Sequence, residues 1–170
     1  MPSDLSFHIR EATEADLVGL EWEGEYSRYR HLYQKSMQDA KKGRRVLLVS
    51  EAAEKLIGQI FIQLNTIPAD PLKLPATGYL YSFRVRPKYR NMGIGTSLVR
   101  RAEEKLRQLA FRRVLIGVAK ENKGARRLYE RLGYKIFAED PGKWSFIDDQ
   151  NSEHVANEPT YIMEKILSGP

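Results

Sequence analysis

The chain has 170 residues, of which 42% are hydrophobic and 29% charged, and its formal net charge is +6. These values are typical of one globular domain and exclude a chain that is disordered throughout. No segment approaches the roughly 18 uninterrupted apolar residues of a membrane span, and the N-terminus lacks the features of a secretory signal. Cysteine is absent, which excludes disulfides and cysteine-based metal sites. We therefore expect a single-domain cytoplasmic protein without a metal site.

The charges are unevenly distributed along the chain. Ten Lys or Arg residues and only two acids lie between Arg84 and Arg113, whereas six acids and no Lys or Arg lie between Glu11 and Glu25. More acids follow in the segment 138–165. This pattern favours a polyanion site in the middle of the chain and a cationic substrate held by the flanks, although a solvated surface of mixed sign is the simpler alternative.

The hydrophobic patterns predict alternating strands and helices. In the first half the predicted elements are a strand over 5–13, a helix over 14–23, a polar helix over 27–43, a hairpin of strands over 44–52 and 55–64, and a proline-rich loop over 65–77. In the second half they are a strand over 78–87, a helix from Ile94 to Leu109, a strand over 112–119, a helix over 122–132, and strands over 134–140, 143–147 and 161–167. This order predicts a mixed sheet with helices on both faces.

Alternation along the strand that ends at Pro87 predicts two faces. Tyr79, Tyr81, Phe83 and Val85 are expected on one face, and Leu80, Ser82, Arg84 and Arg86 on the other. The loop that follows contains Arg90, Gly93 and Gly95 and leads into a helix. A helix N-terminus exposes about four unpaired N–H groups, which suit a phosphate. Glycines would let that phosphate approach the backbone, but they are also common at such corners for steric reasons alone.

Two motifs make a more specific prediction. The first is Arg-x-x-Gly-x-Gly at Arg90, Gly93 and Gly95, and the second is the segment NKGARRLYERLGY one strand later. Together they resemble the GCN5-related N-acetyltransferase (GNAT) family, whose second motif is matched here at Asn122, Ala125, Leu128, Tyr129, Gly133 and Tyr134. The resemblance implies an α/β fold with a mixed, mostly antiparallel central sheet and about four helices on both faces. It also implies one domain over 1–170, with an acetyl-CoA core at about 78–135 and an acceptor side at about 11–45 and 138–165.

The resemblance also implies roles for particular residues. Tyr129 matches the general acid that protonates the CoA thiolate. The main-chain N–H of Val85 matches the group that faces the thioester carbonyl, and Phe83 lies along the pantetheine arm. The expected acetyl-CoA contacts are therefore Phe83, Val85, Arg90, Asn91, Gly93, Ile94, Gly95, Thr96 and Asn122. Without the motif, Tyr129 would be assigned to the core and Asn122 to a helix N-cap.

The general base is left open by the sequence, because the strand over Tyr79–Val85 lacks the carboxylate of the best-understood relatives. The candidates are Glu21, Glu23, Glu25, Glu158, His31, His154 or water. The acceptor is expected to be a small-molecule or peptide amine, and the acids and aromatic residues of the flanks favour a cationic one. We expect no membrane partner and no nucleic acid, while a homodimer is compatible with the sequence.

The favoured function is transfer of an acetyl group from acetyl-CoA to a primary amine, directly within a ternary complex. An alternative is an acyl-CoA-binding sensor without turnover, because the strand carboxylate is missing. Retention of Tyr129 and Asn122 argues against that alternative.

Overall fold

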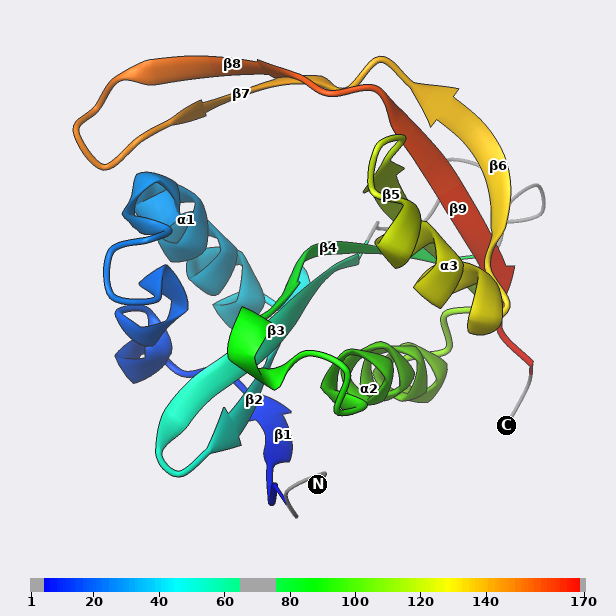
Figure 1. Cartoon of the computed structure of the whole chain (residues 1–170), viewed down its shortest axis with the longest axis horizontal. Coiled ribbons are helices and arrows are strands. Elements are labelled where there is room, and N and C mark those ends of the chain that lie inside the picture. Colours follow the sequence, from blue (N-terminus) through cyan, green and yellow to red (C-terminus); the bar gives the residue numbers. More distant parts are fainter. Residues whose placement is uncertain (1–4, 65–75, 169–170) are drawn as a thin grey trace.

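A computed structural model describes residues 5–64 and 76–168. A seven-stranded sheet with the order β1-β2-β3-β4-β5-β9-β6 forms its centre, and β7 and β8 pair separately as a hairpin (Figure 1). Every pair within the larger sheet is antiparallel except β4 and β5. The strands are β1 (His8–Glu11), β2 (Arg45–Ala52), β3 (Lys55–Leu64), β4 (Thr77–Val85), β5 (Arg113–Ala119), β6 (Lys135–Asp140), β7 (Lys143–Ile147), β8 (Glu153–Asn157) and β9 (Thr160–Ile166). The mixed, mostly antiparallel α/β fold is confirmed.

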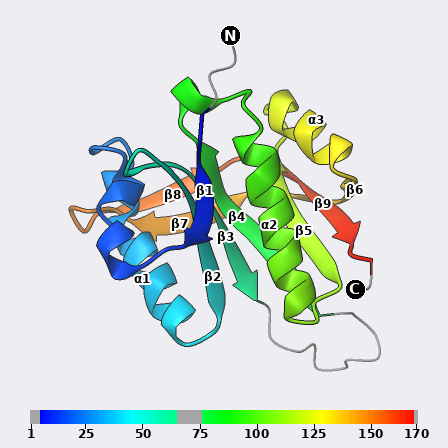
Figure 2. The ribbon, with the colours of Figure 1, turned by 90° about the horizontal axis from the view of Figure 1, so that it is seen from below.

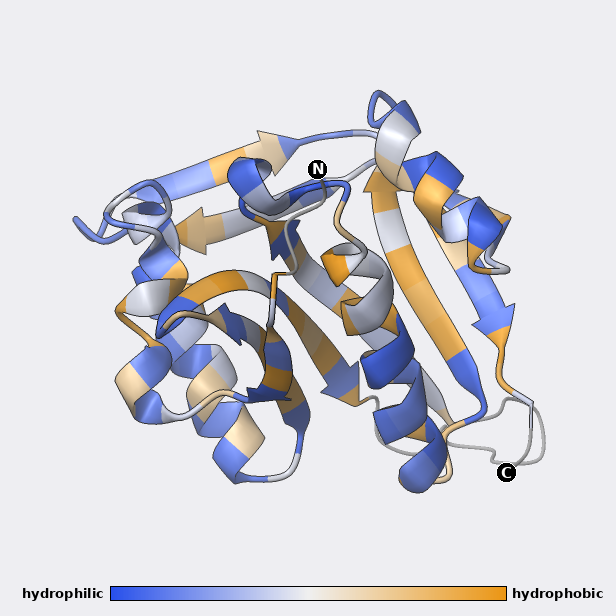
Figure 3. Ribbon diagram, turned by 60° about the horizontal axis from the view of Figure 1, so that its bottom comes forward, coloured by the Kyte–Doolittle hydropathy of each residue, from blue (hydrophilic) through white to orange (hydrophobic). Residues whose placement is uncertain are grey.

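Helices cover both faces of this sheet. Helix α1 (Arg30–Lys41) packs on one face, while α2 (Ile94–Gln108) and α3 (Lys123–Arg131) pack on the other (Figures 1 and 2). Hydrophobic residues follow the central strands, and hydrophilic residues cover the outer surfaces of the helices (Figure 3). None of the helices in the described ranges has the length and apolar character needed to cross a bilayer.

The segment expected as a helix over 14–23 forms two short 3₁₀ turns instead, η1 (Glu14–Asp16) and η2 (Gly19–Glu21). Trp22 and Glu23 adopt left-handed backbone angles, with φ of 48° and 58°, which ends helical winding there. Leu20 and Trp22 are nevertheless buried. A third turn, η3 (Ser27–Tyr29), precedes α1, and a fourth, η4 (Pro87–Tyr89), follows β4.

The remaining elements agree closely with the sequence pattern. The β2–β3 hairpin is confirmed, and its two turn residues Ala53 and Glu54 both have positive φ, as a type I′ turn requires. The stripe of α2 is buried at Ile94, Leu98, Ala102 and Leu106, whereas Leu109 is 42% exposed just beyond the helix. Strand β8 was not predicted, and most of the proline-rich loop over 65–77 lies outside the described residues.

Candidate active site

The loop between β4 and α2 has two glycines with different structural roles. Gly93 is the residue before α2 and has a left-handed φ of 82°, a conformation that costs a non-glycine residue about 1–2 kcal/mol. At Gly95 an added Cβ would lie 3.2 Å from the ring of Phe83. Because no preceding turn supplies acceptors, the first N–H groups of α2 remain available at the positive end of the helix dipole. The loop therefore has the geometry of an anion site.

This loop forms part of a cavity of about 540 Å³ between β4, α2 and α3. All ten residues predicted to form the site line it: Phe83, Val85, Arg90, Asn91, Gly93, Ile94, Gly95, Thr96, Asn122 and Tyr129. The volume lies within the range typical of small-molecule sites, roughly 300–1,000 Å³. The N–H groups, the arginine and the open space at Gly93 fit a phosphate-bearing ligand such as acetyl-CoA.

The cavity reaches the middle of the sheet because β4 and β5 diverge. Their parallel pairing extends from Thr77–Arg113 to Leu80–Ile116, and within the described residues it ends there. Beyond that point β4 continues to Val85 while pairing only with β3. The N–H of Arg86 donates to the carbonyl of Ile57, so alternation directs the neighbouring N–H of Val85 away from β3 and toward the gap. That direction is the one that the proposed thioester contact needs.

A β-bulge in β4 changes which side chains face this cavity. Ser82 and Phe83 together lie opposite Ile60 of β3, and Ser82 has a φ of 48°. A bulge inserts one residue and shifts the alternation beyond it. Phe83 and Val85 therefore pack with Leu80 against the α2 side. The expected sharing of one face by Tyr79, Tyr81, Phe83 and Val85 is wrong, because Tyr81 packs toward α1.

Tyr129 lies on α3 and is 5% exposed. Its ring lies 6.1 Å from that of Phe83 and 6.2 Å from that of Tyr134. Within the described residues its hydroxyl has no hydrogen-bond partner, whereas the hydroxyl of Tyr134 donates to Glu103. Burial raises the pKa of the Tyr129 phenol well above its usual value. Tyr129 is thus a protonated, unengaged phenol at the wall of the cavity.

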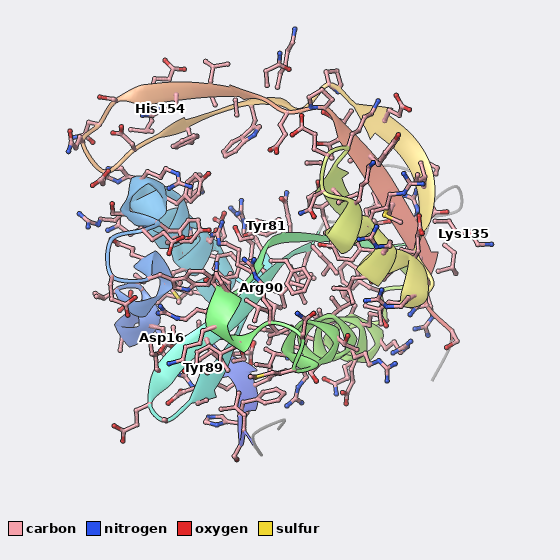
Figure 4. The ribbon with its side chains drawn as sticks, viewed as in Figure 1. Asp16, Tyr81, Tyr89, Arg90, Lys135 and His154 are labelled. Atoms are coloured by element: carbon pink, nitrogen blue, oxygen red, sulfur yellow. The ribbon has the colours of Figure 1, made fainter. Side chains whose placement is uncertain are left out.

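Two of the predicted contact residues also have a structural role. The side chain of Asn122 accepts a hydrogen bond from the N–H of Ala125 at 3.1 Å, so it caps α3 as the simpler interpretation proposed. The Nε of Arg90 donates to the carbonyl of Val85 at 3.1 Å and joins the loop to the end of β4 (Figure 4). Both residues still line the cavity.

A second cavity, of about 710 Å³, lies on the opposite face of β4. Its walls come from β4, β5, the end of η3, α1 and the start of β7. The β7–β8 hairpin extends over α1 (Figure 1), where Tyr29 contacts Trp144 and Phe146 at ring distances of 6.3 and 5.1 Å. The carboxylate of Asp148 stabilises the hairpin turn, because it accepts a hydrogen bond from the N–H of Ser152 and is hydrogen-bonded to the ring of His154 on β8 (Figure 4). Arg84 lines both cavities and marks where they meet.

The acids between Glu11 and Glu25 do not line this second cavity. Several pair with bases elsewhere in the fold: Asp16 with Arg10, Glu14 with Lys41, Glu21 with Arg30, and Glu23 with Arg86. The carboxylates that do line the cavity are Asp140 and Glu158. Of the candidate bases, Glu158 is therefore the one that lines this second cavity.

A comparison of the sequence with family models matches residues 13–134 to the acetyltransferase (GNAT) family. The chain belongs to this family. A curated relative, GCN5-related N-acetyltransferase 6 of the Arabidopsis thaliana chloroplast, is 30% identical over 96 residues, which cover 56% of this chain. The matched region spans 31% of the length of that relative.

Solved GNAT structures share the fold. Arabidopsis thaliana NAA60 in complex with acetyl-CoA superposes with a TM-score of 0.73 at 19% identity, covering 96% of this GNAT chain and 100% of the other. A spermidine N-acetyltransferase SpeG chimera from Vibrio cholerae and hSSAT gives 0.70 at 19% identity, covering 94% and 95%. At these identities the similarity establishes the fold alone.

Arg84 of this GNAT chain lines both cavities but was not predicted as a site residue from the sequence. Strand alternation placed it on the side opposite Tyr79 and Tyr81, and only the bulge brings it to the cavity that they line. A basic residue three positions before Pro87 gives no signal of this kind by itself. Tyr79 was also missed, although its hydroxyl fills the space left by the absent side chain of Gly117 in the second cavity.

Proposed function

We propose that this GNAT chain transfers the acetyl group of acetyl-CoA to a primary amine, directly within a ternary complex. The supporting observation is that the ten predicted residues line one cavity, which meets a second cavity at the gap between β4 and β5. Two cavities that meet at one point suit a donor and an acceptor bound together, because proximity lowers the barrier to a two-substrate reaction.

Each residue then has a defined task. The N–H groups at the start of α2, with Arg90, hold the pyrophosphate of the donor. The N–H of Val85 donates to the thioester oxygen as negative charge develops there. The amine nitrogen forms a bond to the carbonyl carbon while the carbon–sulfur bond breaks, and Tyr129 gives its proton to the departing thiolate. The proton lost by the amine passes to water or to Glu158 in the acceptor cavity.

The acceptor amine reaches the site as an ammonium, for which Asp140 and Glu158 supply the attraction. It gives one proton to water before attack, because only the neutral nitrogen has a lone pair for the carbonyl carbon. The acids near the N-terminus contribute less than their number indicates, since several are paired with arginine or lysine. The proposal for a cationic amine thus depends on two carboxylates.

The Tyr129→Phe variant tests the catalytic assignment. We expect thiol release to fall about 100-fold, because general acid catalysis contributes that order of rate. Acetyl-CoA affinity, measured by calorimetry, should change less than twofold, because the phenyl ring remains. If wild-type protein binds acetyl-CoA yet releases no thiol with any amine, the chain is an acyl-CoA sensor. If Tyr129→Phe retains the full rate, another group is the acid.

A further inference from the structure

Arg84 lies at the junction of the donor and acceptor cavities and lines both. The bulge at Ser82 and Phe83 displaces it from the alternation of the earlier part of β4. Its neighbours Phe83 and Val85 belong to the donor side, and Tyr81 to the acceptor side. Whatever Arg84 binds must therefore lie close to the amine that attacks the thioester.

The guanidinium of Arg84 is held by an aromatic shell. It lies 4.0 Å from the ring centroid of Tyr26 and 5.6 and 6.0 Å from those of Tyr29 and Tyr33. One of its nitrogens also donates to the hydroxyl of Tyr33. The π faces that could have attracted a cationic acceptor thus already hold a cation of the protein itself. The fixed position also means that little side-chain entropy is lost when Arg84 binds a ligand.

The charge of Arg84 is not balanced within the described ranges. Arg86 pairs with Glu23 at 2.8 Å and Arg45 with Asp39 at 3.2 Å, but no ion pair is found there for Arg84. Its Nε is buried without a hydrogen-bond partner. A partly buried cation without a carboxylate partner is unfavourable, and an incoming carboxylate would offset that cost. The planar guanidinium matches a carboxylate with two parallel hydrogen bonds.

We propose that Arg84 binds a carboxylate of the acceptor, so that the acceptor is a free amino acid. The inference depends on the proposed transferase function and specifies its substrate class. Because Arg84 borders both cavities, the carboxylate must lie next to the reacting amine, as it does in an α-amino acid but not at the N-terminus of a peptide. The cavity of about 710 Å³ suits a small molecule. Asp140 and Glu158 then face the ammonium and any basic side chain.

Matched amines test the proposal without requiring turnover. The probes are phenylalanine, phenylalaninamide and phenethylamine, with the corresponding sets built on leucine and lysine, titrated by calorimetry into protein saturated with CoA. We expect the amino acids to bind roughly 10- to 100-fold more tightly than the amides and the decarboxylated amines, since a hydrogen-bonded charge pair is lost in both. The ratio of kcat/KM values with acetyl-CoA should show the same preference.

Variants of Arg84 identify the residue responsible. Arg84→Gln should reduce the preference to within about twofold, and Arg84→Lys should retain part of it, because lysine keeps the charge but not the bidentate geometry. The matched control is Arg28→Gln. Arg28 also stacks on Tyr26 and Tyr29, at 5.1 and 4.6 Å, but does not line the acceptor cavity, so the preference should persist. An unchanged urea unfolding midpoint reports correct folding of each variant.

Several results would overturn the proposal: amines that bind as well without a carboxylate, peptides that bind better than free amino acids, an Arg84→Gln variant that keeps the preference, or no binding by any member of the sets. If Arg84→Gln does not fold, the wild-type comparison still decides. Failure of the transferase function is distinguishable, because it appears as an absence of CoA binding or of thiol release, whatever the acceptor.

Discussion

Two tyrosines five residues apart in sequence, Tyr129 and Tyr134, have opposite environments. The hydroxyl of Tyr134 donates to Glu103 at 2.8 Å in the buried interior, where Lys165 also donates to the same carboxylate at 3.0 Å. The hydroxyl of Tyr129 faces a cavity and makes no hydrogen bond to the rest of the described chain. Helix packing positions both rings, but only one hydroxyl is available for chemistry.

This difference predicts separable effects. Tyr134→Phe should lower the free energy of unfolding by about 1–3 kcal/mol, because a buried carboxylate loses a donor, and should leave kcat within about twofold. Tyr129→Phe should instead lower kcat and leave the free energy of unfolding nearly unchanged. Urea unfolding and thiol-release kinetics on both variants make the comparison. A Tyr134→Phe variant with native stability and low kcat would contradict the assignment of roles.

At the scale of elements, the loop before α2 depends on one left-handed residue. Gly93 has a φ of 82° with open space where a Cβ would lie, and Gly43, after α1, has a φ of 75° with equally open space. The two positions therefore share the same backbone strain, but only Gly93 lines the donor cavity.

Alanine at either position should lower the free energy of unfolding by about 1 kcal/mol through this strain. Only Gly93→Ala should also weaken acetyl-CoA binding, because relaxation of the loop moves the N–H groups that face the pyrophosphate. Calorimetry with acetyl-CoA and urea unfolding measure the two effects. Equal affinities in Gly93→Ala and Gly43→Ala would show that the loop does not form the phosphate site.

At the scale of the whole molecule, buried tyrosines and paired carboxyls set the dependence of stability on pH. The hydrogen bonds of Asp16 with Arg10 and of Asp39 with Lys35 lower the pKa of each carboxyl, and main-chain N–H groups do so for Asp148. Burial raises the pKa of Tyr129 and Tyr134. The three aspartates, whose pKa is lowered, stabilise the fold at pH values above the pKa that they have in the unfolded chain. The two tyrosines, whose pKa is raised, do so at pH values below their unfolded pKa.

We therefore expect stability to be nearly constant between about pH 5 and 9, to fall below about pH 4 as the carboxyls protonate, and to fall above about pH 10 as unfolded tyrosines ionise. Urea unfolding across this pH range measures the free energy of unfolding at each pH. The alkaline decline should be shallower in Tyr129→Phe, which removes one of the ionisable groups. A stability that rises above pH 10 would contradict the sign of the tyrosine contribution.

The residues that determine the family lie close together in the chain, and the sequence alone therefore determined much about this protein. Arg90, Gly93, Gly95 and the motif around Tyr129 predicted the loop, the two helices and the donor cavity, because backbone conformation and helix capping depend on local spacing. The hairpin of β2 and β3 and the buried stripe of α2 were predicted for the same reason.

Only the tertiary structure decided which residues line the second cavity. The bulge that brings Arg84 to the cavity depends on pairing with β3, which strand alternation cannot reveal. The pairing of Glu21 and Glu23 with Arg30 and Arg86 joins residues 9 and 63 positions apart, so counting acids along the chain overestimated the free negative charge. Long-range register and ion pairing fix which side chains face the second cavity, and neither is encoded in local sequence spacing.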